Sequence, residues 1–405
     1  MNISVLAVTS ENIADNYISD METFSGKNAG ICYMKDGYFG TNVSDPEKAA
    51  SRFDKIIPTG HHSIADHPHI TLLFEGIPKI TAMLLNSLGL YTTSEKSGRY
   101  TVMSEDDMNK PYYDKWYQRF IEMISEKYPQ IEEKQREKLA LENARYMLSV
   151  FAPTTTMSYT TTLRQLSYII DMCERYLTTA PSGYDETSFN YKLRVCVSEL
   201  MESLKELGCY SEKITDNKGR NFNFFAKQVY YPIWLSEESF AESYVIKYRC
   251  SFADLAQEQR HRTIDYFMCC DDKTLSANKG RDTEFYLPEI IDFYYKDYIQ
   301  EWYDDLATLR ETYPIATKVD VVETGLISNF MLKCDERLCG RVQLETMRNV
   351  STNLLRFERI LHKSEFMRHE LEKHFKDGKI IPKCGNIQCK EPCVFGRMSA
   401  LMRHI

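Results

Sequence analysis

Apolar residues recur at intervals of three and four along the middle of the chain's first half, a spacing that is typical of amphipathic helices. The pattern predicts long helices over about 113–128, 131–150, 160–178 and 186–207, the last of which ends at Gly208.

The segment ahead of these helices alternates between strand-like and helix-like patterns. The N-terminus predicts a short first strand, and the apolar run His69–Ile77 predicts another β-rich segment. Asp45 and Pro46 predict the start of a helix through EKAASRFDKII, because aspartate accepts hydrogen bonds at an N-cap and proline fits the first turn. Pro78 then opens an apolar helix over KITAMLLNSLG.

The second half repeats this order of elements. The polar segment 216–221 predicts a linker. A strand-like stretch at 243–250, a short helix, and long helices at about 287–312 and 341–375 follow it. A repeat of about 200 residues is too long for a solenoid and indicates duplication of a whole domain. We therefore predict two tandem repeats, which occupy residues 1–215 and 222–405.

The composition is that of a soluble globular protein. With 405 residues, a hydrophobic fraction of 43% and a charged fraction of 27%, the chain can bury a sizeable core. No stretch reaches the roughly 18 consecutive apolar residues of a membrane span, and the N-terminus lacks the basic and apolar regions of a signal peptide. We expect a cytoplasmic protein whose 12 cysteines remain thiols.

The formal net charge of −8 argues against binding along a nucleic-acid backbone. Contacts with phosphate must therefore come from local clusters of arginine, which suit a small nucleotide better than a duplex. We expect neither nucleic acid nor a membrane among the partners.

Two groups of residues invite a metal interpretation. Cys384, Cys389 and Cys393 supply only three ligands, and their spacing fits no standard zinc finger. The segment 59–69 holds four histidines, but none forms a recognised helical metal-binding spacing with a carboxylate. We expect ordinary thiols, a hydrogen-bonded turn before a strand, and no metal.

Two arginine-containing segments carry the candidate chemistry. In the run 257–262, Arg260 and Arg262 flank His261 at the end of an apolar helix, so that several fixed donors can face phosphate or flavin oxygens. In the run 94–100, Gly98 permits close approach of the backbone, and serine and arginine neighbours can bind phosphate. Taken alone, the first run also fits a solvated basic turn and the second an ordinary polar loop.

At these residues the chain resembles the flavin-dependent thymidylate synthases. That family carries an R-H-R-x-x-S-x-N-E-x-S-x-R-Y motif, a preceding G-H-x-S-x-x-E-H turn, a later A-R-x-x-L-P segment and a terminal R-L-C-x-R-A-Q-W-E pattern. All of these pieces have counterparts here, but they are distributed between the two halves.

The first half resembles the family in its turn and its substrate loop. Residues 60–67 are similar to the turn, with Asp66 in place of the usual Glu. Residues 97–100 are similar to the S-x-R-Y end of the long motif. The R-H-R of that motif would fall on 87–89, which read Ser-Leu-Gly, so this copy has lost it.

The later motifs of the first half are also partial. Residues 144–148 resemble the A-R-x-x-L segment, and Ser149 replaces its proline. Residues 163–166 resemble the flavin-binding N-x-R-S-L stretch of the family. The first half has no counterpart of the terminal R-L-C pattern.

The second half carries the complementary pieces. Gln257 and the run 260–262 are present, without the S-x-R-Y that should follow. Arg310, four residues before a proline, resembles the arginine of A-R-x-x-L-P. Residues 337–345 resemble the terminal pattern, with Leu344 in place of Trp.

Because the losses are complementary, the resemblance implies one complete site. Family members are homotetramers in which the E-x-S-x-R-Y loop comes from a different chain than the other dUMP-binding residues. The implied dUMP site consists of Glu95, Ser97, Gly98 and Arg99 of the first half with Gln257, Arg260, Arg310 and Arg337 of the second. The implied FAD-binding residues are Ser63, Arg164, Arg260, His261 and Arg262.

The resemblance also implies the reaction. It is reductive methylation of dUMP to dTMP, with methylenetetrahydrofolate as the one-carbon donor, NADPH as the reductant and FAD as the hydride carrier. Arg337 is the implied catalytic residue, since at the uracil edge it would stabilise negative charge on N3 and O2. Ser97 is assigned to binding, because no histidine is placed by sequence to act as its general base.

Two alternatives remain open at this point. One is a related flavin- and folate-dependent enzyme that transfers another group, such as hydroxymethyl. The other is a catalytically degenerate homologue. By the same resemblance we expect an α+β fold of two tandem copies, each a small antiparallel sheet flanked by long helices. We also expect a homodimer that imitates the family's tetramer.

Overall fold

The chain forms two compact units, which the computed structural model describes over most of its length. Their bounds are 1–96, 153–186 and 190–222 for unit 1, and 97–152, 187–189 and 223–405 for unit 2. The structure describes residues 1–10, 16–33, 35, 37–40, 43, 45–99, 101, 107–179, 185–216, 218–220, 222, 239–269, 272–277, 279–361, 371–385, 393–396, 398 and 402–405.

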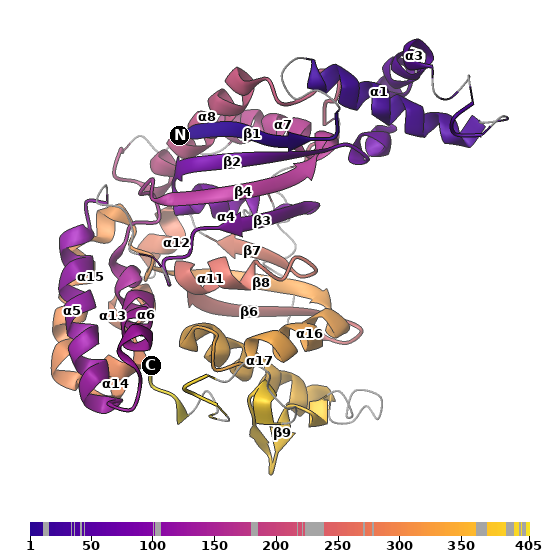
Figure 1. Cartoon of the computed structure of the whole chain (residues 1–405). Coiled ribbons are helices and arrows are strands. Elements are labelled where there is room, and N and C mark those ends of the chain that lie inside the picture. The colour runs from indigo at the N-terminus through magenta and orange to yellow at the C-terminus, as the bar shows by residue number, and fades with distance from the viewer. Residues whose placement is uncertain are drawn as a thin grey trace. The chain divides into compact units, whose positions relative to one another are not determined.

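Unit 1 is built on a four-stranded antiparallel sheet. Its strand order is β1-β2-β4-β3, with bounds Asn2–Val8, His69–Ile77, Thr155–Thr162 and Tyr91–Glu95 respectively (Figure 1). Alternate residues of β2 are buried, among them Ile70, Leu72 and Phe74, as expected for a strand with one face on a core. β2 and β4 therefore supply the centre of the sheet.

Helices complete unit 1. They are α1 (Tyr17–Ala29), α3 (Pro46–Ile56), α4 (Lys79–Leu85), α7 (Leu163–Thr179) and α8 (Phe189–Leu207). α3 begins as predicted, because the Asp45 side chain accepts from the Lys48 amide at 3.0 Å and Pro46 occupies the first turn. α7 follows β4 directly, and its buried face includes Ile169 and Cys173.

Unit 2 contains a second four-stranded antiparallel sheet. Its order is β5-β6-β8-β7, with bounds Ser239–Phe240, Ser243–Ser251, Lys318–Leu326 and Asp265–Cys269 respectively. As in unit 1, the first strand pairs with the second, the fourth lies beside the second, and the third closes the other edge. The small antiparallel sheets of the expected fold class are therefore confirmed, whereas the duplication of a domain stays a prediction.

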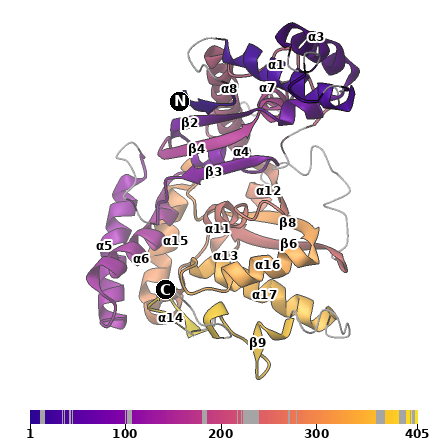
Figure 2. The ribbon, with the colours of Figure 1, turned by 45° about the vertical axis from the view of Figure 1, so that its right-hand side comes forward.

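Helices α16 (Ile327–Arg337) and α17 (Leu344–Leu361) lie side by side along this second sheet in both views (Figures 1 and 2). Tyr244 of β6 packs edge-on to Phe330 of α16 and Phe357 of α17, with ring centroids 5.4 Å apart in each pair. These contacts are part of one hydrophobic core, in which both helices bury their apolar stripes.

A helical layer in unit 2 joins segments that are distant in sequence. α5 (Lys110–Lys127) and α6 (Glu133–Ala144) lie beside α15 (Ile299–Thr308), and α14 spans Glu289–Tyr294 (Figure 2). The rings of Trp116 and Trp302 meet edge to face with centroids 4.8 Å apart, and both side chains are fully buried. The division into compact units therefore does not follow the predicted boundary at 215–222, because 97–152 packs with the second half.

Several predicted elements need correction. Residues 160–162 belong to strand β4, since the threonine-rich run 155–162 is β-branched, and the helix begins only at Leu163. The predicted helix 287–312 is interrupted at Tyr295, whose φ and ψ of −128° and 52° end α14. In the predicted helix 341–375, residues 362–370 lie outside the described chain.

Unit 2 also contains a short strand-like contact between the two halves of the chain. Ser149 and Pro314 form an isolated antiparallel bridge, in which the Val150 amide donates to Tyr313 O at 3.0 Å and the Ile315 amide to Leu148 O at 2.7 Å. Ser149 and Pro314 are the positions that both resemble the proline of A-R-x-x-L-P. Pairing of corresponding positions is the behaviour of an isologous interface.

Candidate functional site

The loop that follows β3 brings the first predicted substrate-binding residues into unit 2. The Arg99 amide donates to Ser97 Oγ at 3.3 Å, and Thr101 donates through its hydroxyl to Ser97 O at 2.9 Å. Glu95 lies in unit 1 and forms an ion pair with Lys79 at 2.5 Å.

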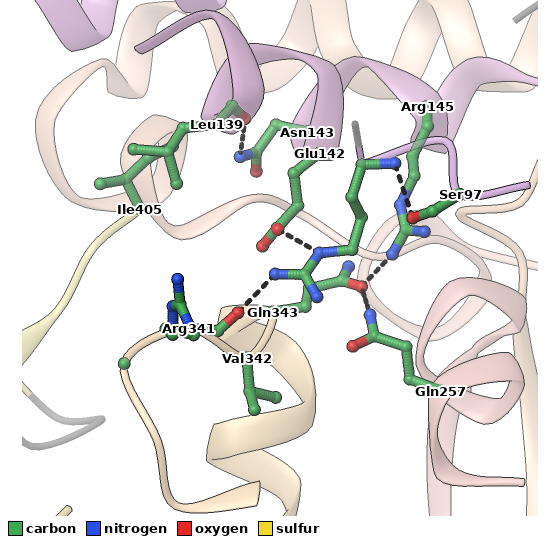
Figure 3. Close-up of polar contacts among 12 residues, drawn as sticks. Ser97, Leu139, Glu142, Asn143, Arg145, Gln257, Arg341, Val342, Gln343 and Ile405 are labelled. Atoms are coloured by element: carbon green, nitrogen blue, oxygen red, sulfur yellow. Dashed lines mark hydrogen bonds and ion pairs between the residues drawn. The ribbon is translucent and has the colours of Figure 1, made fainter. Parts of the chain in front are cut away.

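The guanidinium of Arg99 contacts two different parts of unit 2. Its Nε donates to Glu142 Oε2 of α6 at 2.5 Å, and its Nη2 donates to the main-chain oxygen of Arg341 at 2.6 Å. Glu142 and Arg341 approach the same point from opposite sides (Figure 3). Arg99, from the first half, therefore meets the terminal motif of the second half.

Gln343 is the centre of the polar network beside Arg99. Its side-chain oxygen accepts hydrogen bonds from Arg145 and from Gln257 (Figure 3). Its amide nitrogen donates to the hydroxyl of Tyr146. Tyr146 donates to Glu345 Oε2 at 2.7 Å. Burial lowers the pKa of Arg145, and the nearby charge of Arg99 lowers it further.

Two arginines of this network each have a buried N–H group that makes no hydrogen bond within the described chain. These groups are Nε of Arg145 and Nε of Arg337. Arg337 donates through Nη2 to Gln257 O at 3.2 Å, so its side chain is held against the α11 helix (Phe252–Glu258). Buried donors without partners are costly in a folded protein and are often found where a ligand supplies the acceptor.

The structure separates Arg310 from this network. Arg310 forms a bidentate ion pair with Glu284, in which Nε donates to Oε1 at 2.5 Å and Nη2 donates to Oε2 at 3.0 Å. Arg145, which occupies the corresponding position in the first half, contacts Gln343 instead. Substrate binding by Arg310 stays a prediction, and Arg145 takes the place beside Gln257 for which sequence reasoning selected Arg310.

The Arg260–Arg262 segment follows α11 directly. Arg260 and Arg262 are exposed, whereas His261 is buried, with Nε2 3.5 Å from Glu336 Oε2. Burial lowers the pKa of His261 to about 3, and the nearby charges of Arg337 and Lys333 act in the same direction. His261 is therefore a neutral imidazole at physiological pH.

A buried ionic group lies beneath this segment. Lys333 of α16 lies 2.6 Å from Glu258 Oε2 and 2.8 Å from Glu323 Oε2, and all three side chains are fully buried. Tyr244 and Tyr248 also donate to Glu323, at 2.7 and 2.9 Å. Since Glu258 ends α11 and Lys333 lies one helical turn before Arg337, the ion pair fixes the two elements that carry Gln257 and Arg337.

A pocket of about 430 Å³ opens next to Arg99 within unit 2. Four of its lining side chains are cationic and two are acidic. The lining consists of Arg99, Gln130, Glu132, Gln135, Lys138, Leu139, Glu142, Gly340, Arg341, Cys393, Val394, Phe395 and Arg403. The excess of positive charge suits a small anionic ligand.

Unit 1 has a smaller basic pocket of about 250 Å³ around the predicted flavin residues Ser63 and Arg164. Lys218 and Arg220 also line it, and Tyr168 lies beneath Arg220 at 4.7 Å from its ring centroid. Nε of Arg164 is buried and makes no hydrogen bond in the described chain, while its Nη2 lies 2.5 Å from Asp66. Such donors fit the phosphates of FAD, although the pocket is too small for the whole dinucleotide.

The histidine-rich turn serves the structure of unit 1. His62 is buried, and its ring nitrogens lie 2.7 Å from Tyr168 Oη and 3.0 Å from Ile57 O.

The metal and membrane expectations concern other residues. Cys389, one of the three cysteines of the possible zinc group, lies outside the described residues. Within the described part of the chain, no three His, Cys, Asp or Glu side chains are arranged to bind a metal ion. In the same part, no helix has both the length and the apolar character needed to cross a bilayer.

The site of unit 2 gathers arginines from both halves of the chain, an arrangement that suits a small phosphorylated ligand. Residues 16–176 match the family model described as Thy1, thymidylate synthase complementing protein. This is the family that the motifs resemble, and its model covers less than half of the chain. The likeness of the second half to the family stays a prediction, since the match ends before it.

Two solved structures are similar to part of the chain. One is a UMP/dUMP methylase PolB from Streptomyces cacaoi bound with 5-Br dUMP, with 12% identity over 51% of this chain and 90% of that chain and a TM-score of 0.32. The other is the flavin-dependent thymidylate synthase ThyX from Helicobacter pylori complexed with FAD and dUMP, with 12% identity over 53% and 100% and a TM-score of 0.30. Sequence identities and TM-scores this low support no conclusion about the function of this chain. No curated protein matches the sequence.

Sequence reasoning missed several residues of the network. Glu142, the partner of Arg99, belongs to none of the motifs and has no sequence signal of its own. Gln343 and Glu345 were visible in the terminal pattern, but the pattern gives no indication of what they contact. Spacing alone did not decide between Arg145 and Arg310, because both follow a helix at the same motif position.

Proposed function

We propose that this chain is a flavin-dependent enzyme that methylates dUMP, with the nucleotide bound in unit 2. The observation that carries the proposal is the convergence of Arg99 and Arg145 from the first half with Gln257 and Gln343 from the second. Arg99 is joined to this group through the main chain of Arg341. The family match over residues 16–176 supports the reaction class.

The phosphate of dUMP would lie at Arg99 and the Ser97–Gly98 turn. A doubly charged phosphate competes well for a guanidinium, because charge-assisted hydrogen bonds are about twice as strong as neutral ones. Arg99 Nε now donates to Glu142 at 2.5 Å, and the guanidinium would turn one of its donors to the ligand instead. Arg260 and Arg310 remain further candidates for this contact.

The uracil ring would lie toward Arg337 and Gln257. The buried Nε of Arg337 supports this placement, since it has a hydrogen to donate to a pyrimidine oxygen. As C5 of the ring becomes nucleophilic, charge develops on N3 and O2, and a fixed cation there stabilises the transition state more than the ground state. Arg337 is for this reason the proposed catalytic residue.

FAD, when bound, supplies the hydride that NADPH provides, and methylenetetrahydrofolate supplies the carbon. Arg164 and Ser63 of unit 1 would hold part of FAD by hydrogen bonds to its phosphates, which the free Nε of Arg164 supports. Flavin contacts of the neutral His261 and of its exposed neighbours Arg260 and Arg262 stay a prediction of the resemblance. The second copy in a homodimer would complete the arrangement that the family's tetramer uses.

The proposal is tested by incubating the purified chain with dUMP, methylenetetrahydrofolate, NADPH and FAD. We expect a nucleotide product 14 mass units heavier, by the replacement of one hydrogen by a methyl group on carbon 5. Arg99→Gln should abolish product, whereas the exposed Arg249→Gln on the second sheet should not. A product that carries an added hydroxymethyl group would instead establish the related transferase.

A non-enzymatic role is favoured by one observation. Arg310 and Arg99 are both held by glutamates, Glu284 and Glu142, so that the cations are already compensated without a ligand. A purified protein that shows no flavin absorbance band after incubation with FAD and removal of the unbound cofactor would support this role and overturn the enzyme proposal.

A further inference from the structure

Arg403 is the most deeply buried arginine of the pocket beside Arg99. Its side chain is 1% exposed, among the largest fully buried side chains of the described chain, and it lies close to the C-terminal residue Ile405. Burying a guanidinium is costly unless its donors find acceptors. Such a residue therefore needs a structural or functional explanation, and the proposed mechanism does not use it.

The partners of Arg403 are main-chain oxygens. Nη1 donates to Gly340 O at 3.1 Å and to Val342 O at 2.7 Å, and Nε donates to the main-chain oxygen of Ile405. The guanidinium also lies over the ring of Phe395, 4.3 Å from its centroid. Burial lowers the pKa of Arg403 to about 10, so the side chain is still charged at neutral pH.

The two oxygens held by Arg403 flank the one held by Arg99. Gly340 and Val342 contact Arg403, and Arg341 between them accepts from Arg99 Nη2 at 2.6 Å. The loop 340–342 thus links two arginines that approach it from different segments. A fixed orientation of this loop fixes the acceptor that orients the Arg99 guanidinium.

The C-terminal segment is packed too closely against this loop for the contact to be incidental. A Cβ at Gly340 would lie 2.9 Å from Cys393 Sγ and 3.1 Å from Phe395 Cβ, so only glycine fits without displacement. Arg348 of α17 donates to Arg403 O at 3.1 Å and holds the arginine from its other side.

We propose that Arg403 is a positioning residue for Arg99, acting through the main chain of residues 340–342, so that the C-terminal segment sets the affinity of the site for the phosphate of its nucleotide. The inference rests on the proposed function, because it takes the ligand of Arg99 to be a nucleotide phosphate. No part of the motif pattern includes Arg403, which lies 58 residues beyond the motif residue Glu345.

The test compares dUMP with deoxyuridine, which lacks the phosphate. In Arg403→Met, the loop loses its donors, and we expect dUMP to bind about tenfold more weakly, which corresponds to about 1.4 kcal/mol. Deoxyuridine should bind as to the unchanged protein. Equal losses for both ligands would show a merely structural role and overturn the proposal.

Two further variants distinguish a loss of positioning from a loss of folding. Arg403→Lys keeps the charge but has no planar fork for two oxygens, so it should show most of the dUMP loss with little loss of stability. Arg356→Lys is the matched control, because Arg356 of α17 also donates to a main-chain oxygen, which is that of Lys247 in β6. Its dUMP affinity should be unchanged.

A ligand-free measurement separates this inference from the proposed function. Hydrogen exchange at the amides of residues 338–343 should be faster in Arg403→Lys than in the unchanged protein. If the unchanged protein binds no dUMP, the proposed function fails, while unaltered exchange in the variant would overturn the positioning role by itself.

Discussion

At the scale of single residues, burial explains why ordinary side chains take unusual protonation states. His261 is 6% exposed and lies near two cations, Arg337 and Lys333, so the protonated imidazole is disfavoured. Sequence reasoning identified His261 as part of a basic run, but it could not show that its neighbours point to solvent while the imidazole is buried. Burial is set by the packing of α11 against α16, which the local sequence does not contain.

The lowered pKa of His261 predicts a dependence of stability on pH. The unfolded chain binds a proton at His261 below about pH 6.5, whereas the folded chain does so only near pH 3. Protonation therefore favours unfolding as the pH falls between these values. From pH 7 to pH 5 this residue should lower the free energy of unfolding by about 2 kcal/mol.

Urea unfolding of the unchanged protein and of His261→Asn, at pH 7 and pH 5, measures this contribution. The variant should lose about 2 kcal/mol less over the interval. Asp254 and Glu258 have raised pKa values, caused mainly by burial, and act in the opposite direction, but they are common to both proteins. Parallel pH profiles would show that His261 does not titrate as the structure implies.

At the scale of elements, the sequence predicted what depends on local pattern. The strand His69–Ile77 and the capped start of α3 match the expectation, because alternation and capping are local signals. The strand β8 and the helix α16 were missed, since Lys318–Leu326 is recognisable as a central strand only once its pairing with β6 and β7 is known. The contact of Arg99 with the loop 340–342 could not be predicted for the same reason, because it joins residues that are far apart in the sequence.

The departure of Ser149 from the family's proline has a physical reason in the helical layer. The Ser149 amide donates to the buried carboxylate of Asp107 at 2.9 Å, and its hydroxyl donates to Thr312 O at 2.5 Å. A proline would remove the amide donor. The preceding residue Leu148 has φ and ψ of −68° and 147°, a conformation that proline tolerates, so donor loss is the main cost.

We predict that Ser149→Pro lowers the free energy of unfolding by about 2–3 kcal/mol, because a hydrogen bond to a charged group is lost. Ser149→Ala retains the amide and should cost only about 1 kcal/mol. Chemical denaturation of both variants checks the order. If Ser149→Pro were as stable as the unchanged protein, Asp107 would not depend on this amide.

At the scale of the whole molecule, the chain passes several times between its two units. Residues 97–152 leave unit 1 after β3, join unit 2, and the chain returns at 153. The two tandem repeats stay a prediction, and the sequence gave no sign that α5 and α6 of the first half pack on α15 of the second. Long-range packing of this kind follows from which apolar stripes fit, and periodicity does not encode it.

The packing of α5 and α6 against α15 predicts that the second half of the chain cannot fold alone. A fragment of residues 222–405 lacks Trp116 and Phe120, which contact Trp302 with ring centroids 4.8 and 5.9 Å apart. We expect this fragment to lack a cooperative urea transition, and to gain one when mixed with residues 1–215 from a separate chain. Native near-UV circular dichroism of the isolated fragment would refute the prediction.

The early position of α5 and α6 has a consequence for biosynthesis. Their partner α15 ends at Thr308, about 180 residues after α5 ends at Lys127. At a translation rate of about 5–20 residues per second, the ribosome needs roughly 10–40 s to produce it. Throughout that interval the aromatic face around Trp116 is uncovered on the nascent chain, which makes it a natural client for chaperones that bind emerging polypeptides.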